Sequence, residues 1–330
     1  MDEASFSLIK NKIMETPTLV RVVVSVVFGV VSYSLRFFFA PTNQGFFCDD
    51  KSIRFPQREE TVRIQNVYFA AIPTTVLLFT VGEFVLNIGE NERIFWYGRW
   101  NWRQRLGQLL RFTTIWLLGM AINMFFLNLF KLSVGSLRPY FFTLCAGNDG
   151  ICPFNDDDYF NDFYTCQRLP DDNSVVLDAR RSFYSGHASI AFFFAIFLIL
   201  YIHARILPLF RQFIDLFIAL YALLIGAASF VAITRLTDHK HHSVDIVCGA
   251  LAGTAVAVCV VTFHREHFFP ATPAVVVADA APAPADDPVS TTSAATTTPI
   301  ADGNSDKGKK KTKAPETIES PVREEAVAMI

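Results

Sequence analysis

The sequence has few charged residues and almost no excess of either sign. Only 18% of its 330 residues are Asp, Glu, Lys or Arg, against about 25% in ordinary soluble domains, and the formal net charge is −2. A chain so close to neutral has no global basic field of the kind that attracts nucleic acid. The apolar residues also lack an amphipathic period, because they gather in long blocks. These absences argue against a soluble domain and against a nucleic-acid partner.

What the chain does have is hydrophobic residues, 52% of the total, arranged in six blocks. A helix needs about 20 apolar residues to cross the hydrocarbon core of a bilayer, and several blocks meet that length. Buried core helices of a large soluble protein are the alternative, which six such runs disfavour. We therefore predict an all-α polytopic membrane protein with six transmembrane helices, in the blocks 18–40, 66–89, 109–130, 188–210, 213–234 and 243–263.

Composition divides the chain into three parts. Lys10 and Lys12 precede the first block, as in a signal peptide, but its apolar run is too long and no convincing cleavage site follows. We expect an N-terminal segment 1–17 and an uncleaved first span, with the membrane domain covering 18–265. Residues 266–330 are rich in Ala, Pro, Asp, Thr and Ser. This composition cannot bury apolar area, so it predicts a disordered tail.

Three polar segments stand where apolar blocks meet loops: KLSVGSLRP at 131–139, SFYSGH at 182–187 and RLTDHKHHSVD at 235–245. No run of membrane length separates the first segment from the second, so both lie on one side of the membrane. The fourth and fifth blocks cross and return, which brings the third segment to that same side. Ionisable groups at the edge of a span are costly and mark function. The sequence therefore predicts one composite site at one membrane face.

The third segment offers a nucleophile. His241 and Asp245 are four residues apart, so on a helix they share a face. The carboxylate would fix the imidazole tautomer and leave the other ring nitrogen free to attack. Arg235 lies beyond the fifth block, and its planar guanidinium suits phosphate oxygens. Taken alone, a structural hydrogen bond would explain the His–Asp pair better.

The other two segments offer an acid and an anion cradle. Ser185 and Gly186 open the fourth block, where the first helix amides lack internal partners and attract anions. His187 can donate a proton to a departing alkoxide. Lys131 and Arg138 are seven residues apart and face the same way on a helix. Each signal alone also fits a helix cap or a snorkelling cation.

A metal site is the rival interpretation of the histidine-rich third segment. Imidazoles and carboxylates do bind zinc. However, residues 241 and 242 would point to different faces of a helix, and no companion ligand set occurs elsewhere in the sequence. We therefore expect neither a metal nor another cofactor. The residues concerned are Asp238, His239, His241 and His242.

Cysteines bear on the compartment that the site faces. Four of the six, Cys48, Cys145, Cys152 and Cys166, fall in the two loops on the site's own side. An even set on one face suggests an oxidising lumen or exterior and allows two disulfides, whose pairing the sequence does not fix. Free cysteines are the alternative. The arginine-rich loop 90–108 lies on the opposite side of the membrane. Because positively charged loops favour the cytoplasm, this loop weakly indicates that the opposite side is cytoplasmic.

Together, the three segments resemble the signature motifs of the lipid phosphate phosphatases, the integral-membrane branch of the type 2 phosphatidic acid phosphatase (PAP2) superfamily. The resemblance covers about residues 15–265. It implies magnesium-independent hydrolysis of phosphatidate, lysophosphatidate, sphingosine 1-phosphate and ceramide 1-phosphate through a phosphohistidine. It also implies six spans, cytoplasmic termini and a site facing the cell exterior or an organelle lumen; we expect the plasma membrane.

The resemblance also implies residue roles. His241 would be the nucleophile, Asp245 would orient it, and His187 would protonate the leaving lipid hydroxyl. The phosphate oxygens would be held by Lys131, Arg138, Arg235, Ser185 and Gly186. The chain departs from the family pattern at Thr234, where serine is usual, and at Tyr184, where the broader superfamily has proline. No N-glycosylation sequon occurs in the loop 140–182.

Other functions remain open at this point. A catalytically silent adhesion or scaffold relative would have lost the nucleophile or the cations, which are all present here. A polyisoprenyl-diphosphate phosphatase of the same superfamily is a further alternative. Vanadium haloperoxidases share the anion site but are soluble, and a transporter would place polar residues at mid-span. The expected partners are lipid phosphates and the bilayer, and the sequence leaves homo-oligomerisation undecided.

Overall fold

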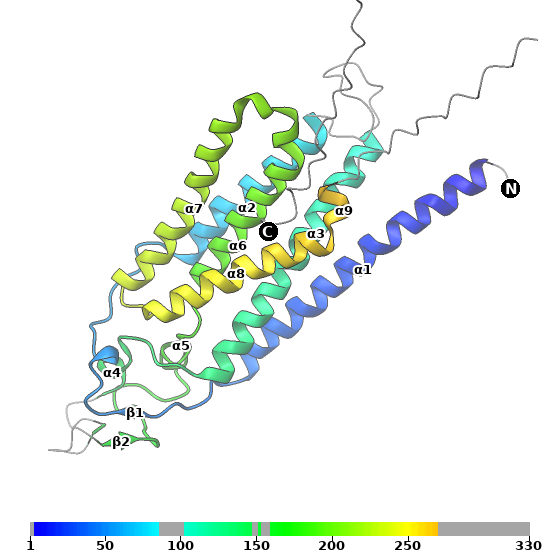
Figure 1. Cartoon of the computed structure of the whole chain (residues 1–330). Coiled ribbons are helices and arrows are strands. Elements are labelled where there is room, and N and C mark those ends of the chain that lie inside the picture. Colours follow the sequence, from blue (N-terminus) through cyan, green and yellow to red (C-terminus); the bar gives the residue numbers. More distant parts are fainter. Residues whose placement is uncertain (1–2, 86–101, 147–150, 153–158, 270–330) are drawn as a thin grey trace, which may run out of the picture. The chain divides into compact units, whose positions relative to one another are not determined.

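A computed structural model describes residues 3–85, 102–146, 151–152 and 159–269. Within these residues, six helices are long and apolar enough to cross a bilayer. They confirm the predicted all-α membrane architecture (Figure 1). The spans are Pro17–Phe38, Ile64–Glu83, Arg105–Val134, Gly186–Leu209, Arg211–Thr237 and Ser243–Phe263.

Each of these spans consists mainly of its own long helix. The long helices are α1 (Glu3–Phe38), α2 (Ile64–Thr80), α3 (Trp102–Val134), α6 (Gly186–Tyr201), α7 (Ile214–Thr237) and α8 (Ser243–Phe263). Wider π-helical turns extend α2 (η2, Val81–Val85) and α6 (η3, Ile202–Ile206), and the 3₁₀ turns η4 (Leu207–Leu209) and η5 (Arg211–Phe213) connect α6 to α7. The short elements are β1 (Phe46–Phe47), η1 (Lys51–Ile53), α4 (Phe141–Cys145), β2 (Phe160–Asn161), α5 (Ser174–Ala179) and α9 (Arg265–Phe268).

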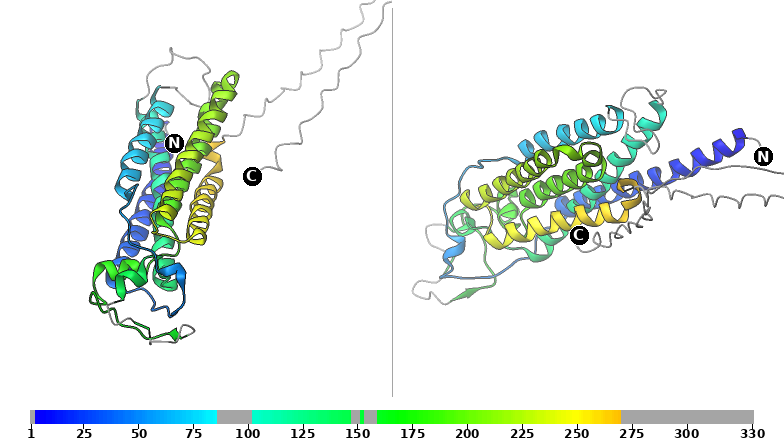
Figure 2. Two further views of the ribbon diagram at one scale, coloured as in Figure 1. Left: turned by 90° about the vertical axis from the view of Figure 1, so that its left-hand side faces the viewer. Right: turned by 45° about the horizontal axis from the view of Figure 1, so that its top comes forward.

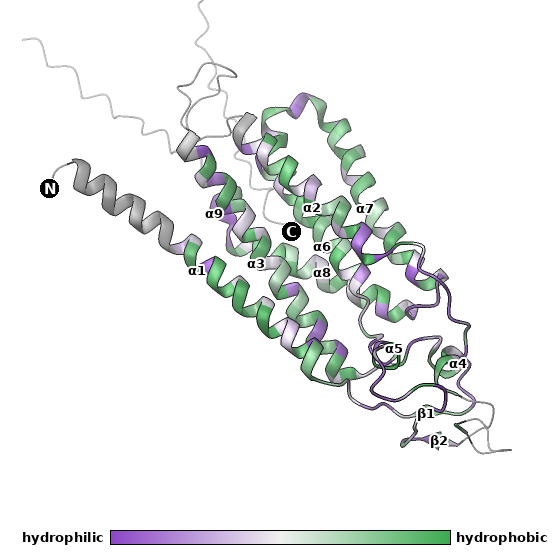
Figure 3. Ribbon diagram, turned by 180° about the vertical axis from the view of Figure 1, so that it is seen from behind, coloured by the Kyte–Doolittle hydropathy of each residue, from purple (hydrophilic) through white to green (hydrophobic). Residues whose placement is uncertain are grey.

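Helix α6 is the central span. It packs against α3, α7 and α8 and is the most deeply buried of the six. The contact with α8 is close because a Cβ atom on Gly253 would lie only 2.0 Å from the backbone oxygen of Ser189. Apolar side chains on the outer faces stay exposed, for example Val26, Leu216 and Leu251. Such surfaces suit hydrocarbon, and Figure 3 shows hydrophobic residues along most of each span.

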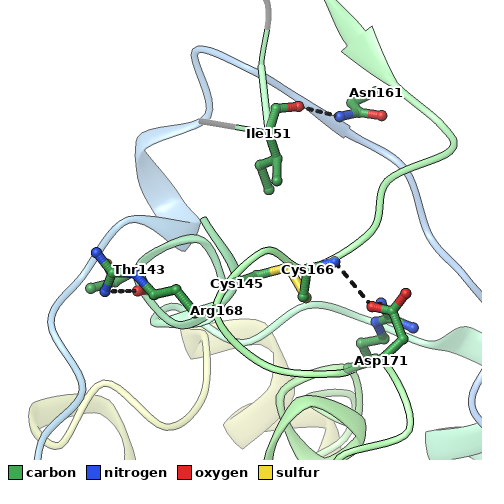
Figure 4. Close-up of a disulfide and its surroundings, with 8 residues drawn as sticks. Thr143, Cys145, Ile151, Asn161, Cys166, Arg168 and Asp171 are labelled. Carbon is green, nitrogen blue, oxygen red and sulfur yellow. Dashed lines mark hydrogen bonds and ion pairs between the residues drawn. A yellow bond between two sulfur atoms is a disulfide. The ribbon is translucent and has the colours of Figure 1, made fainter. Parts of the chain in front are cut away.

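A second set of residues closes one end of the spans. There, β1 and β2 form an antiparallel pair, and α4 and α5 pack beside them around a separate apolar cluster. The two views of Figure 2 agree with Figure 1 that these short elements gather at one end. The disulfide Cys48–Cys152 joins the two loops that make this end, and Cys145–Cys166, shown in Figure 4, closes a ring within the second of them.

The other end holds a buried ion pair. Glu83 on η2 accepts hydrogen bonds from Arg205 Nε and Nη2 at 3.3 and 3.1 Å, and from Tyr201 Oη at 2.9 Å. The two π-helical turns therefore meet through a two-point contact between guanidinium and carboxylate. This contact joins α2 to α6 at the end opposite the disulfides.

Element boundaries differ from the sequence prediction in three places. Helix α3 begins at Trp102, inside the loop expected at 90–108, and α1 runs unbroken through the boundary expected at residue 17. Phe268 on α9 is fully buried in the core, so the folded part extends past residue 265. Hydropathy detects the apolar part of a helix, whereas backbone hydrogen bonds carry the helix further into polar sequence. Residues 86–101 and 270–330, with most of the expected tail, lie outside the described residues.

Candidate active site

Backbone hydrogen bonds join the three polar segments. The amide of Ser182 donates to the carbonyl of Ser136 at 2.9 Å, which links the second segment to the first. The amide of Ser185 donates to the carbonyl of Asp245 at 2.9 Å, which links the second to the third. Segments far apart in the sequence therefore meet at the end of α3, the start of α6 and the start of α8.

The start of α6 lies close to α3. Ser185 is the N-cap residue, and its hydroxyl accepts from the amide of Ala188 at 3.5 Å. Gly186 begins the helix, and a Cβ atom there would lie 3.1 Å from Leu127 of α3. The missing side chain of Gly186 therefore lets α3 approach the start of α6, where the first helix amides lack partners within the helix.

His241 and Asp245 are held together by a third residue. Asp245 Oδ2 lies 3.6 Å from His241 Nδ1, too far for a strong direct hydrogen bond. Ser182 Oγ donates to the same carboxylate oxygen at 2.6 Å and lies 3.4 Å from His241 Nδ1. Asp245 also caps α8, because it accepts from the amide of His242 at 3.0 Å. The Nδ1 edge of His241 therefore faces a fixed carboxylate.

His241 is neutral at physiological pH. Its side chain is 3% exposed, and burial lowers the pKa of His241 to about 3. The positive charges of Arg138 and Lys131 act in the same direction, while Asp245 opposes them. A neutral imidazole has a free lone pair, as a nucleophile requires.

Arg235 is completely buried. Its Nη2 forms an ion pair with Asp238 at 2.8 Å, and its Nη1 one with Glu60 at 3.3 Å. The same Nη1 lies 3.3 Å from His187 Nε2. A buried guanidinium needs such partners to offset the loss of water. Arg235 therefore connects the second histidine to two carboxylates.

Arg138 and Lys131 complete the set of cations. Arg138 Nη2 pairs with Asp178 on α5 at 3.0 Å. Burial raises the pKa of Asp178, but Arg138 and then Lys131 outweigh it and hold that pKa below its usual range. Lys131 Nζ donates to the carbonyl of Arg181 at 2.6 Å. Both cations are nearly buried and lie close enough to His241 to depress its pKa.

The structure brings together the sequence-predicted residues and adds four that the sequence prediction did not include. Lys131, Arg138, Ser185, Gly186, His187, Arg235, His241 and Asp245 all lie at the ends of α3, α6, α7 and α8. The added residues are Ser182, which bridges His241 to Asp245, and the acids paired with arginines, Glu60, Asp178 and Asp238. Ser182 and Asp238 lie inside the polar segments, so their position in the sequence could have indicated a role in the site. No sequence feature pointed to Glu60 or Asp178.

The histidine-rich segment does not gather into a ligand set. Among the described residues, no group of three His, Cys, Asp or Glu side chains is placed to hold a metal ion. Asp238 instead forms an ion pair with Arg235. It also accepts hydrogen bonds from the amide and the hydroxyl of Thr61, at 2.8 and 2.7 Å.

Comparison with known proteins identifies the family. The model of the PAP2 superfamily matches residues 112–269, a range that includes all three polar segments. The chain is 32% identical to phospholipid phosphatase 2 of Mus musculus, over 71% of this chain and 80% of that protein. It is 32% identical to phospholipid phosphatase 2 of Homo sapiens, over 69% and 76%, and 26% identical to phospholipid phosphatase 1 of Mus musculus, over 69% and 77%. No solved structure matches the chain.

Proposed function

The chain belongs to the lipid phosphate phosphatases of the PAP2 superfamily, and on that premise we propose that it hydrolyses phosphatidate, lysophosphatidate, sphingosine 1-phosphate and ceramide 1-phosphate without magnesium. One observation carries the proposal. A neutral, buried imidazole with a fixed carboxylate, His241 with Asp245, lies near the cations Arg138 and Lys131, and the third cation, Arg235, contacts a second imidazole, His187. This set supplies a nucleophile, an acid and a binding site for a phosphate dianion.

In the first step, His241 attacks the phosphorus atom. Its Nδ1 faces Asp245 and Ser182, so Nε2 is the nitrogen that forms the new bond. As the N–P bond forms, the bond from phosphorus to the lipid oxygen breaks, and His187, whose protonated form the bound phosphate dianion stabilises, gives its proton to that oxygen. The products of this step are the dephosphorylated lipid and a phosphohistidine. Asp245 stabilises the positive charge that develops on the ring.

In the second step, water attacks the phosphohistidine. His187, now neutral, accepts a proton from the water as the O–P bond forms and the N–P bond breaks. Inorganic phosphate leaves, His241 returns to its neutral form, and His187 carries the proton needed for the next turnover. One lipid phosphate and one water thus give one lipid alcohol and one phosphate.

Protein cations take the place of a metal ion in this scheme. Phosphoryl transfer depends mainly on positioning and on stabilising charge on the equatorial oxygens. Lys131, Arg138 and Arg235 supply three positive charges, and the amides at the start of α6 supply partial positive charge. The proposed ligands of the phosphate group are therefore Lys131, Arg138, Arg235, Ser185 and Gly186.

We place this site on the exoplasmic side, at the cell exterior or an organelle lumen. Both disulfides lie at the same end of the spans as the three polar segments, and disulfides persist in oxidising compartments. An even number of spans puts the segments before the first and after the last on one side, which we take as the cytoplasm. The plasma membrane is the membrane that we propose. A membrane-impermeant reagent for a cysteine introduced at Phe163, which is 91% exposed, would label intact cells only in this orientation.

The decisive experiment is phosphate release from phosphatidate in detergent micelles with a metal chelator present. We expect the purified full chain to be active and His241→Ala to lose about three orders of magnitude in kcat or more. His203→Ala is the matched control, because His203 is exposed on η3 at the opposite end. Robust activity of His241→Ala, or complete dependence on added magnesium, would refute the mechanism.

A further inference from the structure

The Nη1 nitrogen of Arg235 has two neighbours of different kinds. One is His187 Nε2 at 3.3 Å, and the other is a carboxylate oxygen of Glu60, also at 3.3 Å. The other nitrogens of the guanidinium face the protein, since Nη2 pairs with Asp238 and Nε lies 3.4 Å from Thr234 Oγ1. Nη1 is thus the nitrogen that lies beside His187, the proposed acid, and a phosphate oxygen would bind to it. The carboxylate of Glu60 already occupies that binding position.

The two carboxylates on Arg235 are held very differently. The Asp238 side chain is 7% exposed, and two hydrogen bonds from Thr61 fix it. The Glu60 side chain is 34% exposed and comes from the loop between η1 and α2. A partly exposed carboxylate can leave an ion pair at little cost in free energy, because water solvates it. A buried carboxylate that leaves its partner stays uncompensated, which costs much more. Glu60 is therefore the partner that can be exchanged.

A polar cavity beside Glu60 gives the carboxylate somewhere to go. Its volume is about 390 Å³, and its lining residues are Gln57, Arg58, Glu59, Glu60, Arg63 and Lys240. Three of these side chains are cations, so a carboxylate turned into the cavity keeps favourable electrostatic partners. The cavity is open to water and has three cations against the one negative charge of Glu59, so the displaced position of Glu60 would be solvated and electrostatically favourable.

We propose that Glu60 is an internal competitor for phosphate, which neutralises Arg235 in the empty site and turns into the polar cavity when a substrate phosphate takes its place. The inference rests on the proposed function, because it takes Arg235 as a phosphate ligand. A carboxylate and a phosphate dianion repel each other when they share one guanidinium nitrogen. Every phosphate ligand must therefore displace Glu60 to bind.

The displacement of Glu60 costs the same for an esterified and for a free phosphate. A lipid substrate offsets that cost by burying its acyl chains. Inorganic phosphate buries no apolar surface, so its absolute affinity stays low while Glu60 is present. Glu60 would thus limit inhibition by the product, and it would also raise KM for the lipid.

The test compares Glu60→Gln with Glu59→Gln in the purified full chain. Both changes remove one negative charge from the same loop, but Glu59 is a neighbour on the cavity wall and not a partner of Arg235. We expect Glu60→Gln to lower the inhibition constant of inorganic phosphate roughly tenfold, corresponding to about 1.4 kcal/mol, and to lower KM for phosphatidate as well. Glu59→Gln should leave both constants as in the wild type. Glu60→Asp, with a shorter side chain, should give an intermediate inhibition constant.

A binding measurement makes the test independent of turnover. Inorganic phosphate should raise the thermal unfolding temperature of Glu60→Gln more than that of the wild type at equal concentration. An unchanged or higher inhibition constant in both Glu60 variants would overturn the inference, and so would a loss of kcat alone. Failure of the proposed function would look different, because the wild type would then release no phosphate in the presence of chelator.

Discussion

Ser182 Oγ donates a 2.6 Å hydrogen bond to Asp245 Oδ2, which ties the loop before α6 to the first turn of α8. The same hydroxyl lies 3.4 Å from His241 Nδ1. Because the direct separation of His241 and Asp245 is 3.6 Å, the carboxylate is held by other groups, the Ser182 hydroxyl and the amide of His242. Ser182 is thus a positioning residue for the proposed nucleophile.

Ser182→Ala should lower kcat by roughly 10- to 100-fold, the range found when a histidine that binds a metal loses its outer hydrogen-bonding partner. KM should change little, because Ser182 is not a proposed phosphate ligand. Steady-state kinetics on phosphatidate micelles measures both constants. Ser182→Thr keeps the hydroxyl and should recover part of the activity; equal losses in both variants would point to a packing defect instead.

Asp245→Asn should lower kcat by about 10³-fold or more, since the amide cannot stabilise the imidazolium that forms during attack. Asp238→Asn should act mainly on KM, because Asp238 positions Arg235 and does not contact His241 in the described structure. The split between kcat and KM checks the assignment. The opposite pattern, with Asp245→Asn changing KM alone, would contradict it.

The pH dependence of stability should identify the buried histidine. The pKa of His241 in the folded protein, about 3, is below the ordinary value of 6.5, so the unfolded state binds more protons between these values. His241 should therefore destabilise the fold as pH falls below 6.5, by roughly 2 kcal/mol at pH 5. Thermal unfolding at pH 7 and pH 5 measures the difference in stability between the wild type and His241→Gln. Lowering the pH should destabilise the wild type more than the variant.

His242 offers a control of opposite sign. Its hydrogen bond to Asp245 raises the pKa of His242, so its stabilising effect is present below 6.5 and is lost as pH rises through the folded value. The wild type should therefore gain stability at pH 5 relative to His242→Gln. The same trend in both variants would contradict the assigned charge states.

The two disulfides should differ in their effect on stability. Cys48–Cys152 closes a loop with a sequence separation of 104, and Cys145–Cys166 one of 21. Chain entropy predicts losses of about 4.7 and about 3.3 kcal/mol, respectively, when each pair is changed to serine. Thermal unfolding of the two double variants should show the larger loss for the first pair. Equal effects would show that contacts within the closed end outweigh chain entropy.

The close contact of α8 with α6 should not tolerate a side chain. Gly253→Ala places a Cβ atom where Ser189 and Phe193 backbone atoms now lie, and overpacking should cost about 1–3 kcal/mol or more. Gly226→Ala on α7 is the control, since its Cβ would meet nothing within 4 Å. A gain of up to about 1 kcal/mol is expected there, from helix propensity. Similar unfolding temperatures for the two variants would argue against the described packing.

The spans, and the common side of the three polar segments, could be predicted from the sequence alone. Membrane insertion depends on the length and hydropathy of local segments, which are written along the chain. The number of spans between Arg138, His187 and His241 then fixed their common side. The motif residues also led to the family that the comparisons confirm.

The contacts between side chains of distant segments became evident only from the folded structure. Glu60 lies on Arg235, Asp178 on Arg138 and Ser182 between His241 and Asp245, and none of these pairs has a sequence period that could reveal it. The cysteine pairing was decided in the same way, since the sequence allowed several connectivities. Contacts between distant segments depend on how whole helices and loops pack together. A pattern of residues along one segment contains no information about that packing.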